Sequence, residues 1–362
     1  MSRGALAAYA LPALPLALLT LPLYVLVPAF YARELMLPIA AVGSALLIVR
    51  IVDALADPLT GLFADRWRPR FGRRRLWVLA ASIPTALCAF LVFTPPAGAG
   101  LAYLTLCGVA LSLASTAVLV PYSAWGAELT TDYRGRARVT AWRETFALIG
   151  TLLALFAQVL VPMAGFSGDG AVLASIGIFT LITLPLASLL CTWLVREPQD
   201  HSKNPLPLKQ GLALLLANRP FIRLILAFLL NGFANGFPAT LFLFYVSEKL
   251  GAGDSAGPLL VLYFICGLAG VPFWLWLARK TSKHVAWCIG MLLACACFLP
   301  APFLSTGQIG IFAAVCVGTG LALGADLVLP PAIQADVIDV DTATTGEQRS
   351  GLYFAAWGLA TK

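Results

Sequence analysis

The chain has 362 residues, of which 60% are apolar and 11% are charged, and its formal net charge is +7. Soluble domains carry ~45–50% apolar and ~25% charged residues, so this composition excludes most soluble proteins, soluble enzymes among them. A membrane-spanning helix takes ~20 residues, and a chain of this length holds roughly eleven of them with short loops between. We therefore expect a polytopic α-helical membrane protein.

The apolar runs predict the individual spans. The first run is longer than the apolar core of a signal peptide and lacks a small-residue cleavage site, so we interpret it as a span. The last run has only twelve residues, too few to cross ~30 Å of hydrocarbon, and we expect that the chain stops inside a helix. In chain order the spans cover roughly 8–31, 37–64, 76–95, 100–129, 139–163, 171–195, 220–247, 256–278, 285–304, 307–335 and 351 onward.

Basic residues concentrate in every second loop. Lys and Arg cluster in 65–75, 130–138, 196–219 and 279–284, whereas the intervening loops carry only Arg33 and Lys249. Because cytoplasmic loops are the basic ones, this asymmetry predicts a cytoplasmic N-terminus, and we expect a bacterial inner membrane as the location. The same clustering accounts for the positive charge without a nucleic-acid partner.

The segment 196–219 is the longest polar stretch and contains REPQDHSKNPLPLK, which is typical of a linker. Six predicted spans precede it. We therefore expect an N-terminal six-helix half at 1–195, a cytoplasmic linker at 196–219, and an incomplete C-terminal half at 220–362 that ends within helix 11.

Cysteine and histidine provide little material for metal or nucleophilic chemistry. The eight cysteines lie in apolar stretches without a Cys-x-x-Cys pair, and the two histidines, His201 and His284, lie in polar loops. From the placement of the cysteines we expect no metal site and no disulfide framework. We expect no enzyme, because no span contains a histidine that could act as a base.

The strongest candidate site lies on the second span. Arg50, Asp53 and Asp57 are spaced so that they share one face of a helix. Each charge near the bilayer centre costs ~2.5–3.5 kcal/mol on insertion scales. Two carboxylates one turn apart repel each other when both are ionised, so the pair either keeps a proton or holds a small cation. The pattern predicts cation binding at Asp53 and Asp57; the alternative is a static ion pair of Arg50 with Asp53.

Other polar and aromatic residues inside spans are candidates for binding a solute, because an intramembrane charge or amide is costly without a function. The alternatives are ion pairing between helices for the charged residues, interhelical hydrogen bonding for the amides, and simple packing for the aromatic rings. The candidates are Arg143, Asn231, Asn235, Asp326, Tyr24, Tyr122 and Trp125.

Charged residues at the predicted cytoplasmic ends form a third set. In GLFADR (61–66) an acid ends a span, and GRRR (72–75) follows in the loop. An acid opposite a basic loop can hold two helices together in one conformation, whereas the alternatives are plain membrane topology and a solvated helix cap. The candidates for such a conformational lock are Asp65, Arg66, Arg73, Arg74, Glu128 and Asp336.

The loop motif resembles the signature between helices 2 and 3 of the major facilitator superfamily. Four stretches, the first of which contains GLFADR, resemble the glycoside–pentoside–hexuronide:cation symporters of the melibiose-permease type: VDALADPLTGLFADR (52–66), PYSAWGAELTTDYRGRAR (121–138), NGFANGFPATLFLFYV (231–246) and ADVIDVDTATTGEQRSGLYFAAW (335–357). The resemblance runs over the whole chain. It implies an all-α membrane fold with two pseudo-symmetric six-helix halves and a central cavity.

The resemblance also implies roles for single residues. Asp53 and Asp57 stand where the family keeps two cation-binding carboxylates, Arg143 matches an arginine near the sugar, and Lys362 matches a lysine of helix 11. We therefore add Lys362 to the candidates for binding the solute.

Three positions depart from the family pattern. Near Ala17, where the family has an acid in helix 1, this chain has none. Ala56 and Leu119 stand where the family has a polar residue and an acid. Sodium needs several oxygen ligands and neither residue supplies one, so the sequence favours a proton as the coupling ion.

We expect a secondary active transporter that works by alternating access. It would couple a proton or sodium to the symport of a sugar or glycoside-like solute, in a lipid bilayer, as a monomer and without a cofactor. Two alternatives are a transporter of lysolipid-like or other amphipathic solutes and a truncated, non-transporting remnant.

Overall fold

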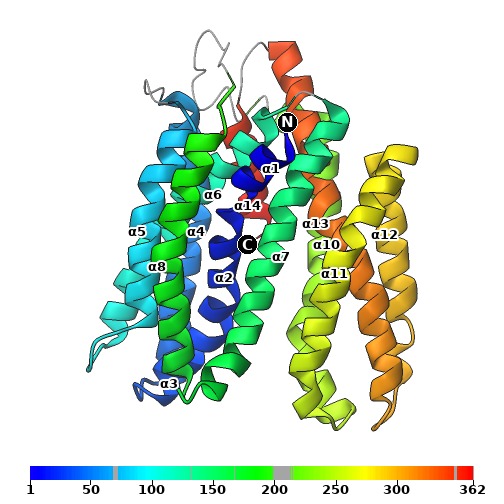
Figure 1. Cartoon of the computed structure of the whole chain (residues 1–362). Coiled ribbons are helices and arrows are strands. Elements are labelled where there is room, and N and C mark those ends of the chain that lie inside the picture. The colour runs from blue at the N-terminus through cyan, green and yellow to red at the C-terminus, as the bar shows by residue number, and fades with distance from the viewer. Residues whose placement is uncertain are drawn as a thin grey trace.

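The computed structural model describes residues 1–67, 72–130, 132–166, 168–198, 213, 215–345 and 349–361. In these residues the regular structure is helical throughout (Figure 1). Ten of the described helices are long and apolar enough to cross a membrane. The eleventh predicted run forms a helix of 12 residues, Ser350–Thr361, which is shorter than a span. The expected all-helical membrane fold is therefore confirmed.

The first span is divided by prolines. It consists of α1 (Arg3–Ala10), α2 (Ala13–Leu21), the π-helical turn η1 (Pro22–Leu26) and α3 (Val27–Arg33). A proline lacks the backbone N–H that an α-helix uses four residues back, so Pro12 and Pro22 stand where the regular ladder is interrupted.

Five long helices complete what we call the N-terminal group. They are α4 (Ile39–Arg66), α5 (Arg75–Phe93), α6 (Leu101–Glu128), α7 (Tyr133–Met163) and α8 (Asp169–Leu194). Glu197 accepts hydrogen bonds from the backbone N–H groups of Arg74 (2.8 Å) and Arg75 (3.3 Å), and so caps the N-terminus of α5.

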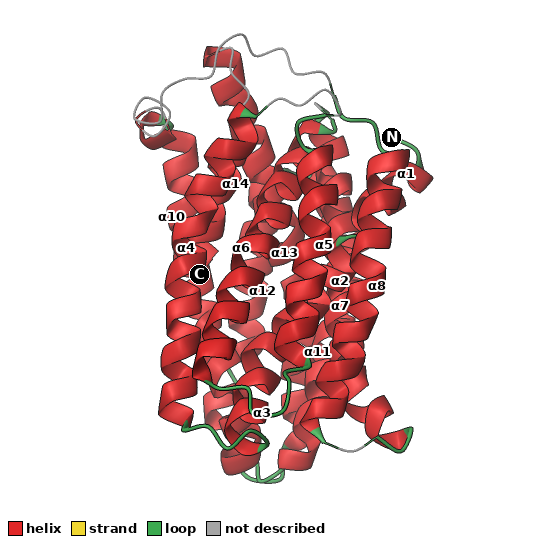
Figure 2. Ribbon diagram, turned by 90° about the vertical axis from the view of Figure 1, so that its left-hand side faces the viewer, coloured by secondary structure: helices red, strands yellow, loops and turns green. Residues whose placement is uncertain are grey.

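The C-terminal group begins at α10, after the predicted linker 196–219, most of which lies outside the described residues. It contains α10 (Arg219–Phe244) with η2 (Tyr245–Lys249), η3 (Gly253–Ser255), α11 (Ala256–Lys280), α12 (Lys283–Phe298), η4 (Ala301–Phe303), α13 (Ile309–Thr345) and α14 (Ser350–Thr361). Helix α13 runs ten residues past its predicted end at 335, because the acids in its last turns are paired. Helix α14 lies against α4 and α6 of the N-terminal group (Figure 2).

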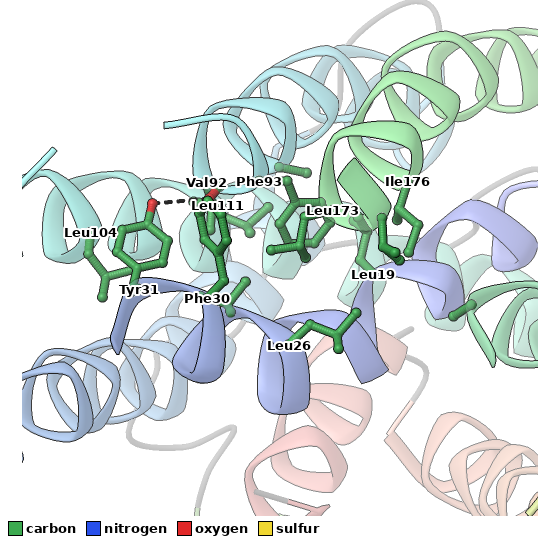
Figure 3. Packing of buried hydrophobic residues seen from close by; sticks show 14 of the residues in the cluster. Leu19, Leu26, Phe30, Tyr31, Val92, Phe93, Leu104, Leu111, Leu173 and Ile176 are labelled. Atoms are coloured by element: carbon green, nitrogen blue, oxygen red, sulfur yellow. Dashed lines mark hydrogen bonds between the residues drawn. The ribbon is translucent and has the colours of Figure 1, made fainter. Parts of the chain in front are cut away.

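Apolar packing builds a separate core for each group. In the N-terminal group, Phe30 of α3 and Leu19 of α2 pack with Phe93 and with Ile176 of α8, and the Tyr31 hydroxyl donates a 3.0 Å hydrogen bond to the Val92 carbonyl (Figure 3). A different cluster, around Val246, Leu250 and Phe312, belongs to the C-terminal group alone.

The two groups meet at one end of the bundle. The starts of α5, α7 and α12 lie there, at the top of Figure 1. These helix starts carry Arg73, Arg74, Arg136 and Lys283, and we call this end the basic end. The cluster around Trp274, Ile333 and Tyr353 includes Ala124 of α6, so its packing crosses from one group to the other. The conformation is therefore closed at the basic end.

Candidate functional site

Two buried carboxylates of α4 face two hydroxyls of α6. Asp53 is 9% exposed and Asp57 is 2% exposed. The Thr116 hydroxyl lies within hydrogen-bond distance of Oδ1 of both, at 3.2 Å from Asp53 and 3.1 Å from Asp57. The Ser112 hydroxyl donates to Asp53 Oδ1 at 2.7 Å. Oxygens from four side chains therefore gather at mid-helix.

The spacing along both helices explains this arrangement. Asp53 and Asp57 are one turn apart on α4, and Ser112 and Thr116 are one turn apart on α6, so the two pairs face each other where the helices pack. The hydroxyl pair was missed at the sequence level. Its signal is the matching four-residue spacing inside an apolar span.

Arg50 approaches the carboxylates from the accessible side. Its Nη1 lies 3.9 Å from Asp53 Oδ2, and its side chain is 41% exposed. The guanidinium also lies 4.1 Å from the ring centroid of Tyr24, which is 45% exposed. Arg50 therefore makes a long, accessible contact with Asp53 rather than a closed ion pair.

Helix α14 covers the other side of the site. A Cβ atom added to Gly358 would lie 2.6 Å from Asp57 Oδ2, so only a glycine permits this approach. Asp57 belongs to the N-terminal group and Gly358 to the C-terminal group. The carboxylate site thus lies on the boundary between the two groups.

Arg143, a predicted solute residue of the N-terminal group, lies toward the basic end, unlike Tyr24 beside Arg50. Arg143 Nη2 pairs with Glu144 Oε1 at 2.6 Å. Arg143 also lines a cavity of about 10 Å³, room for about one water molecule, together with Tyr9 of α1 and Phe354 of α14. Lys362 lies outside the described residues.

Tyr122 and Trp125 are fully buried in the N-terminal group. Tyr122 stacks on Tyr9 with ring centroids 4.9 Å apart, and Trp125 meets the Tyr9 ring edge-on at 6.2 Å. The Tyr122 hydroxyl donates to the Tyr9 carbonyl at 2.6 Å. Both rings are covered in this conformation, and their contact with a solute stays a prediction.

Three helices of the C-terminal group converge on Asp326. Asn235 Nδ2 of α10 donates to Asp326 Oδ2 at 3.1 Å, and Trp287 Nε1 of α12 donates to Asp326 Oδ1 at 2.7 Å. Asn235 is exposed, and Asn231 is half-buried one turn earlier on α10. Sequence reasoning singled out both asparagines and Asp326 but not the indole donor.

A first ion cluster at the basic end holds α14 against the N-terminal group. Arg74 Nη2 lies 2.6 Å from Asp65 Oδ1 and 2.8 Å from Glu128 Oε1, and Arg73 Nη2 lies 2.8 Å from the same Glu128 oxygen. Asp65 also accepts hydrogen bonds from the backbone N–H groups of Gly351 (3.1 Å) and Leu352 (2.9 Å). The carboxylate thus caps the N-terminus of α14.

Burial alone would lower the pKa of the Arg74 guanidinium, but the charges of Glu128 and Asp65 outweigh it and hold that pKa above its ordinary value. This cluster, which we call the Asp65 clamp, is therefore permanently charged at its centre. Arg66, the remaining predicted residue of this segment, is exposed at the end of α4.

A second ion cluster joins α7 to the C-terminal group. Arg136 pairs with Asp336 at 3.2 Å and also with Asp339. Lys283 Nζ lies 2.6 Å from Asp336 Oδ2 and 3.8 Å from the ring centroid of Tyr133. We call this set the Arg136 clamp. Asp336 was expected as a lock residue, and its partners come from both groups.

Two helical groups clamped together at one end, with buried carboxylates on their boundary, are typical of a secondary membrane transporter. A family model described as MFS/sugar transport protein matches residues 8–362, and the chain belongs to that family. It is a symporter of the major facilitator superfamily rather than an enzyme, as the sequence led us to expect. The melibiose-permease type within the superfamily stays a prediction.

Named relatives support this assignment. The chain is 24% identical to an uncharacterized symporter of Synechocystis, over 90% of this chain and 76% of the relative. It is 25% identical to a sodium-dependent lysophosphatidylcholine symporter of Danio rerio, over 81% of this chain and 62% of the relative. In structure it is similar to the transporter FucP in the outward conformation, with a TM-score of 0.65 at 16% identity, covering 99% of this chain and 95% of that one.

Proposed function

We propose that the protein couples solute transport to sodium, with Na⁺ bound by Asp53, Asp57, Ser112 and Thr116. The observation that carries this proposal is the pair of α6 hydroxyls beside the two carboxylates. Small hard cations favour oxygen ligands, and a positive ion relieves the repulsion between two buried carboxylates.

The sequence favoured a proton because Ala56 and Leu119 bring no oxygen. Ser112 and Thr116 supply oxygens from a different turn of α6, which removes that objection to sodium. A relative described as sodium-dependent points the same way.

Sodium at this site would also act on the conformation. Asp57 packs against Gly358 of α14, so the charge of the site acts electrostatically on the C-terminal group. We propose that the basic end faces the cytoplasm of a bacterial inner membrane, since basic loops stay on that side. On this view, the described conformation is closed toward the cytoplasm, and the transporter works as a monomer.

For the solute we propose a sugar or glycoside-like molecule that binds between the groups. Asn231, Asn235 and Asp326 offer amide and carboxylate hydrogen-bonding groups suited to hydroxyls. The description of the family model supports a sugar. A lysolipid is the second candidate, because a relative is described as a lysophosphatidylcholine symporter.

The coupling proposal predicts that Asp57→Asn abolishes sodium-driven accumulation, because the variant lacks the charge that attracts the ion. The measurement is uptake of labelled solute into proteoliposomes under separately imposed sodium and pH gradients. Asp169→Asn, in the first turn of α8, serves as the control and should accumulate solute normally. Uphill uptake by Asp57→Asn, or wild-type uptake driven by a pH gradient alone, would contradict the proposal.

A thermal-shift panel separates the two solute classes. We expect sugars or glycosides to raise the melting temperature in the presence of sodium, and lysophosphatidylcholine to leave it unchanged. The reverse result would establish the lysolipid as the solute, and sodium coupling would then be tested with that substrate.

A further inference from the structure

A basic cleft lies beside the Arg136 clamp, between α7 and α11. These helices lie side by side toward the basic end (Figure 1). The cleft has a volume of about 350 Å³, which is in the size range of ligand pockets. Its walls include Arg134, Arg138 and Trp142 of α7, Leu275 and Arg279 of α11, and Lys283 of α12. We call it the α7–α11 cleft.

Three of the four cations in this cleft have no acidic partner among the described residues. Four of its ten lining residues are cationic and none is acidic. Lys283 is committed to Asp336, but within the described chain Arg134 and Arg138 make neither an ion pair nor a side-chain hydrogen bond. Within the part of the chain that the structure describes, Arg279 uses only Nε, in a 3.2 Å hydrogen bond to the Leu275 carbonyl. Three exposed guanidinium groups are thus available to an anion.

The cleft is layered along the membrane normal. Helix α7 starts at the basic end, so Arg134, Arg138 and Trp142 lie successively deeper, one turn apart. Helix α11 ends there, so Leu275 lies one turn deeper than Arg279. Both walls therefore place guanidinium groups at the surface and apolar side chains below them.

We propose that the α7–α11 cleft binds an anionic phospholipid, with its phosphate between Arg134, Arg138 and Arg279 and its glycerol and upper acyl chains against Trp142 and Leu275. Guanidinium groups bind phosphate oxygens by paired hydrogen bonds, and basic pockets between membrane helices suit lipid head groups. A free phosphate would use the upper layer alone and would leave the apolar layer unoccupied.

This lipid is distinct from the transported solute. It binds at the side of the molecule, across the N-terminal and C-terminal groups, and away from Asp53 and Asp57. Because the walls come from both groups, the bound lipid favours the conformation that is closed at the basic end.

The test compares two double variants that remove the same charge at the same spacing. Arg134→Gln with Arg138→Gln alters the cleft, whereas Arg219→Gln with Arg223→Gln alters exposed arginines at the start of α10. Native mass spectrometry measures phosphatidylglycerol retained by the purified full chain, with phosphatidylcholine as the neutral lipid. Melting temperatures without added lipid verify that each variant is folded.

Each basic residue near an anionic lipid contributes about five-fold in affinity, so we expect about 25-fold weaker phosphatidylglycerol binding for the cleft variant. The α10 variant should stay within about two-fold of the wild type, and phosphatidylcholine should not be retained. Equal weakening in both variants would overturn the proposal, because binding would then reflect surface charge alone. Displacement of the lipid by inorganic phosphate or glycerol 3-phosphate at similar concentration would overturn it too, because the cleft would then be a site for soluble phosphates.

Discussion

Thr116 is the residue that joins the two carboxylates, since its hydroxyl reaches both Asp53 and Asp57. Most hydroxyls in these helices behave differently. Thr105 and Ser115, also on α6, donate to carbonyl groups one turn back, at 2.8 Å and 2.6 Å. A hydroxyl that leaves its own helix for a carboxylate on another one is therefore a sign of a functional site.

Thr116→Val tests this role while keeping the side-chain shape. We expect the apparent sodium affinity to fall about ten-fold, because one of four oxygen ligands is lost and the carboxylates lose a donor. Sodium-dependent thermal shifts give the affinity directly. Thr105→Val is the matched control on the same helix and should bind sodium like the wild type; equal affinity in both variants would refute the ligand role of Thr116.

Some residues of the site and the clamps could be identified from the sequence, and others could not. Asp53 and Asp57 stand out because a charge in an apolar span has a large energetic cost. Ser112 and Thr116 do not stand out, because a hydroxyl can donate its hydrogen bond to a carbonyl group of its own helix. Lys283, at the start of α12, looks like an ordinary basic loop residue, and only the fold places it beside Asp336.

At the scale of helices, the crossing of α4 and α14 depends on small residues. A Cβ atom on Gly61 would lie 2.5 Å from the Gly351 carbonyl oxygen and 2.7 Å from the Ala355 Cβ. Such close approach lets backbones touch and is typical of helix pairs in membranes. Since α14 covers Asp57, this crossing also determines how the site is closed.

A comparison of Gly61→Ala with Gly43→Ala separates the effect of the tight helix crossing on stability from the effect of helix propensity. Both lie in α4 and both gain up to ~1 kcal/mol of helix propensity, but a Cβ atom added to Gly43 would meet no neighbouring atom within 4 Å. We expect Gly43→Ala to melt at or above the wild-type temperature. Gly61→Ala should destabilise the closed conformation by ~1–3 kcal/mol through overpacking, with a lower melting temperature and slower sodium-driven uptake. Matching behaviour of the two variants would show that the crossing is not tight.

Helix boundaries followed from hydropathy where the chain passes from lipid to water. The predicted span 37–64 and the observed Ile39–Arg66 differ by two residues at each end. Hydropathy placed the end of a helix too early where charged side chains are paired with one another instead of solvated, as in the last turns of α13. It also could not divide the first span, because the interruptions come from individual prolines rather than from average polarity.

At the scale of the molecule, two clamps hold the groups together at the basic end. Each contains a buried arginine with more than one carboxylate in contact, Arg74 in the Asp65 clamp and Arg136 in the Arg136 clamp. Replacing one of the acids leaves the buried arginine with too little negative charge nearby. Removing one partner in this way is strongly destabilising, whereas replacing a whole buried ion cluster with apolar residues is often not. We propose that transport requires both clamps to open, in which case their strength sets the balance between conformations.

Asp336→Asn tests that balance. Asp336 contacts Arg136 across the boundary, whereas Asp341 pairs with Arg349 at 2.9 Å within the C-terminal group, so Asp341→Asn is the matched control. The reporter is Thr140→Cys, a buried position one turn deeper than Arg136 that lines the small cavity between the groups, in a background without the eight native cysteines. We expect Asp336→Asn to raise its rate of maleimide labelling about ten-fold, which corresponds to ~1.4 kcal/mol in favour of the open basic end. Asp341→Asn should label like the parent, because its ion pair does not join the groups; equal rates in the two variants would mean that the Arg136 clamp does not hold the basic end closed.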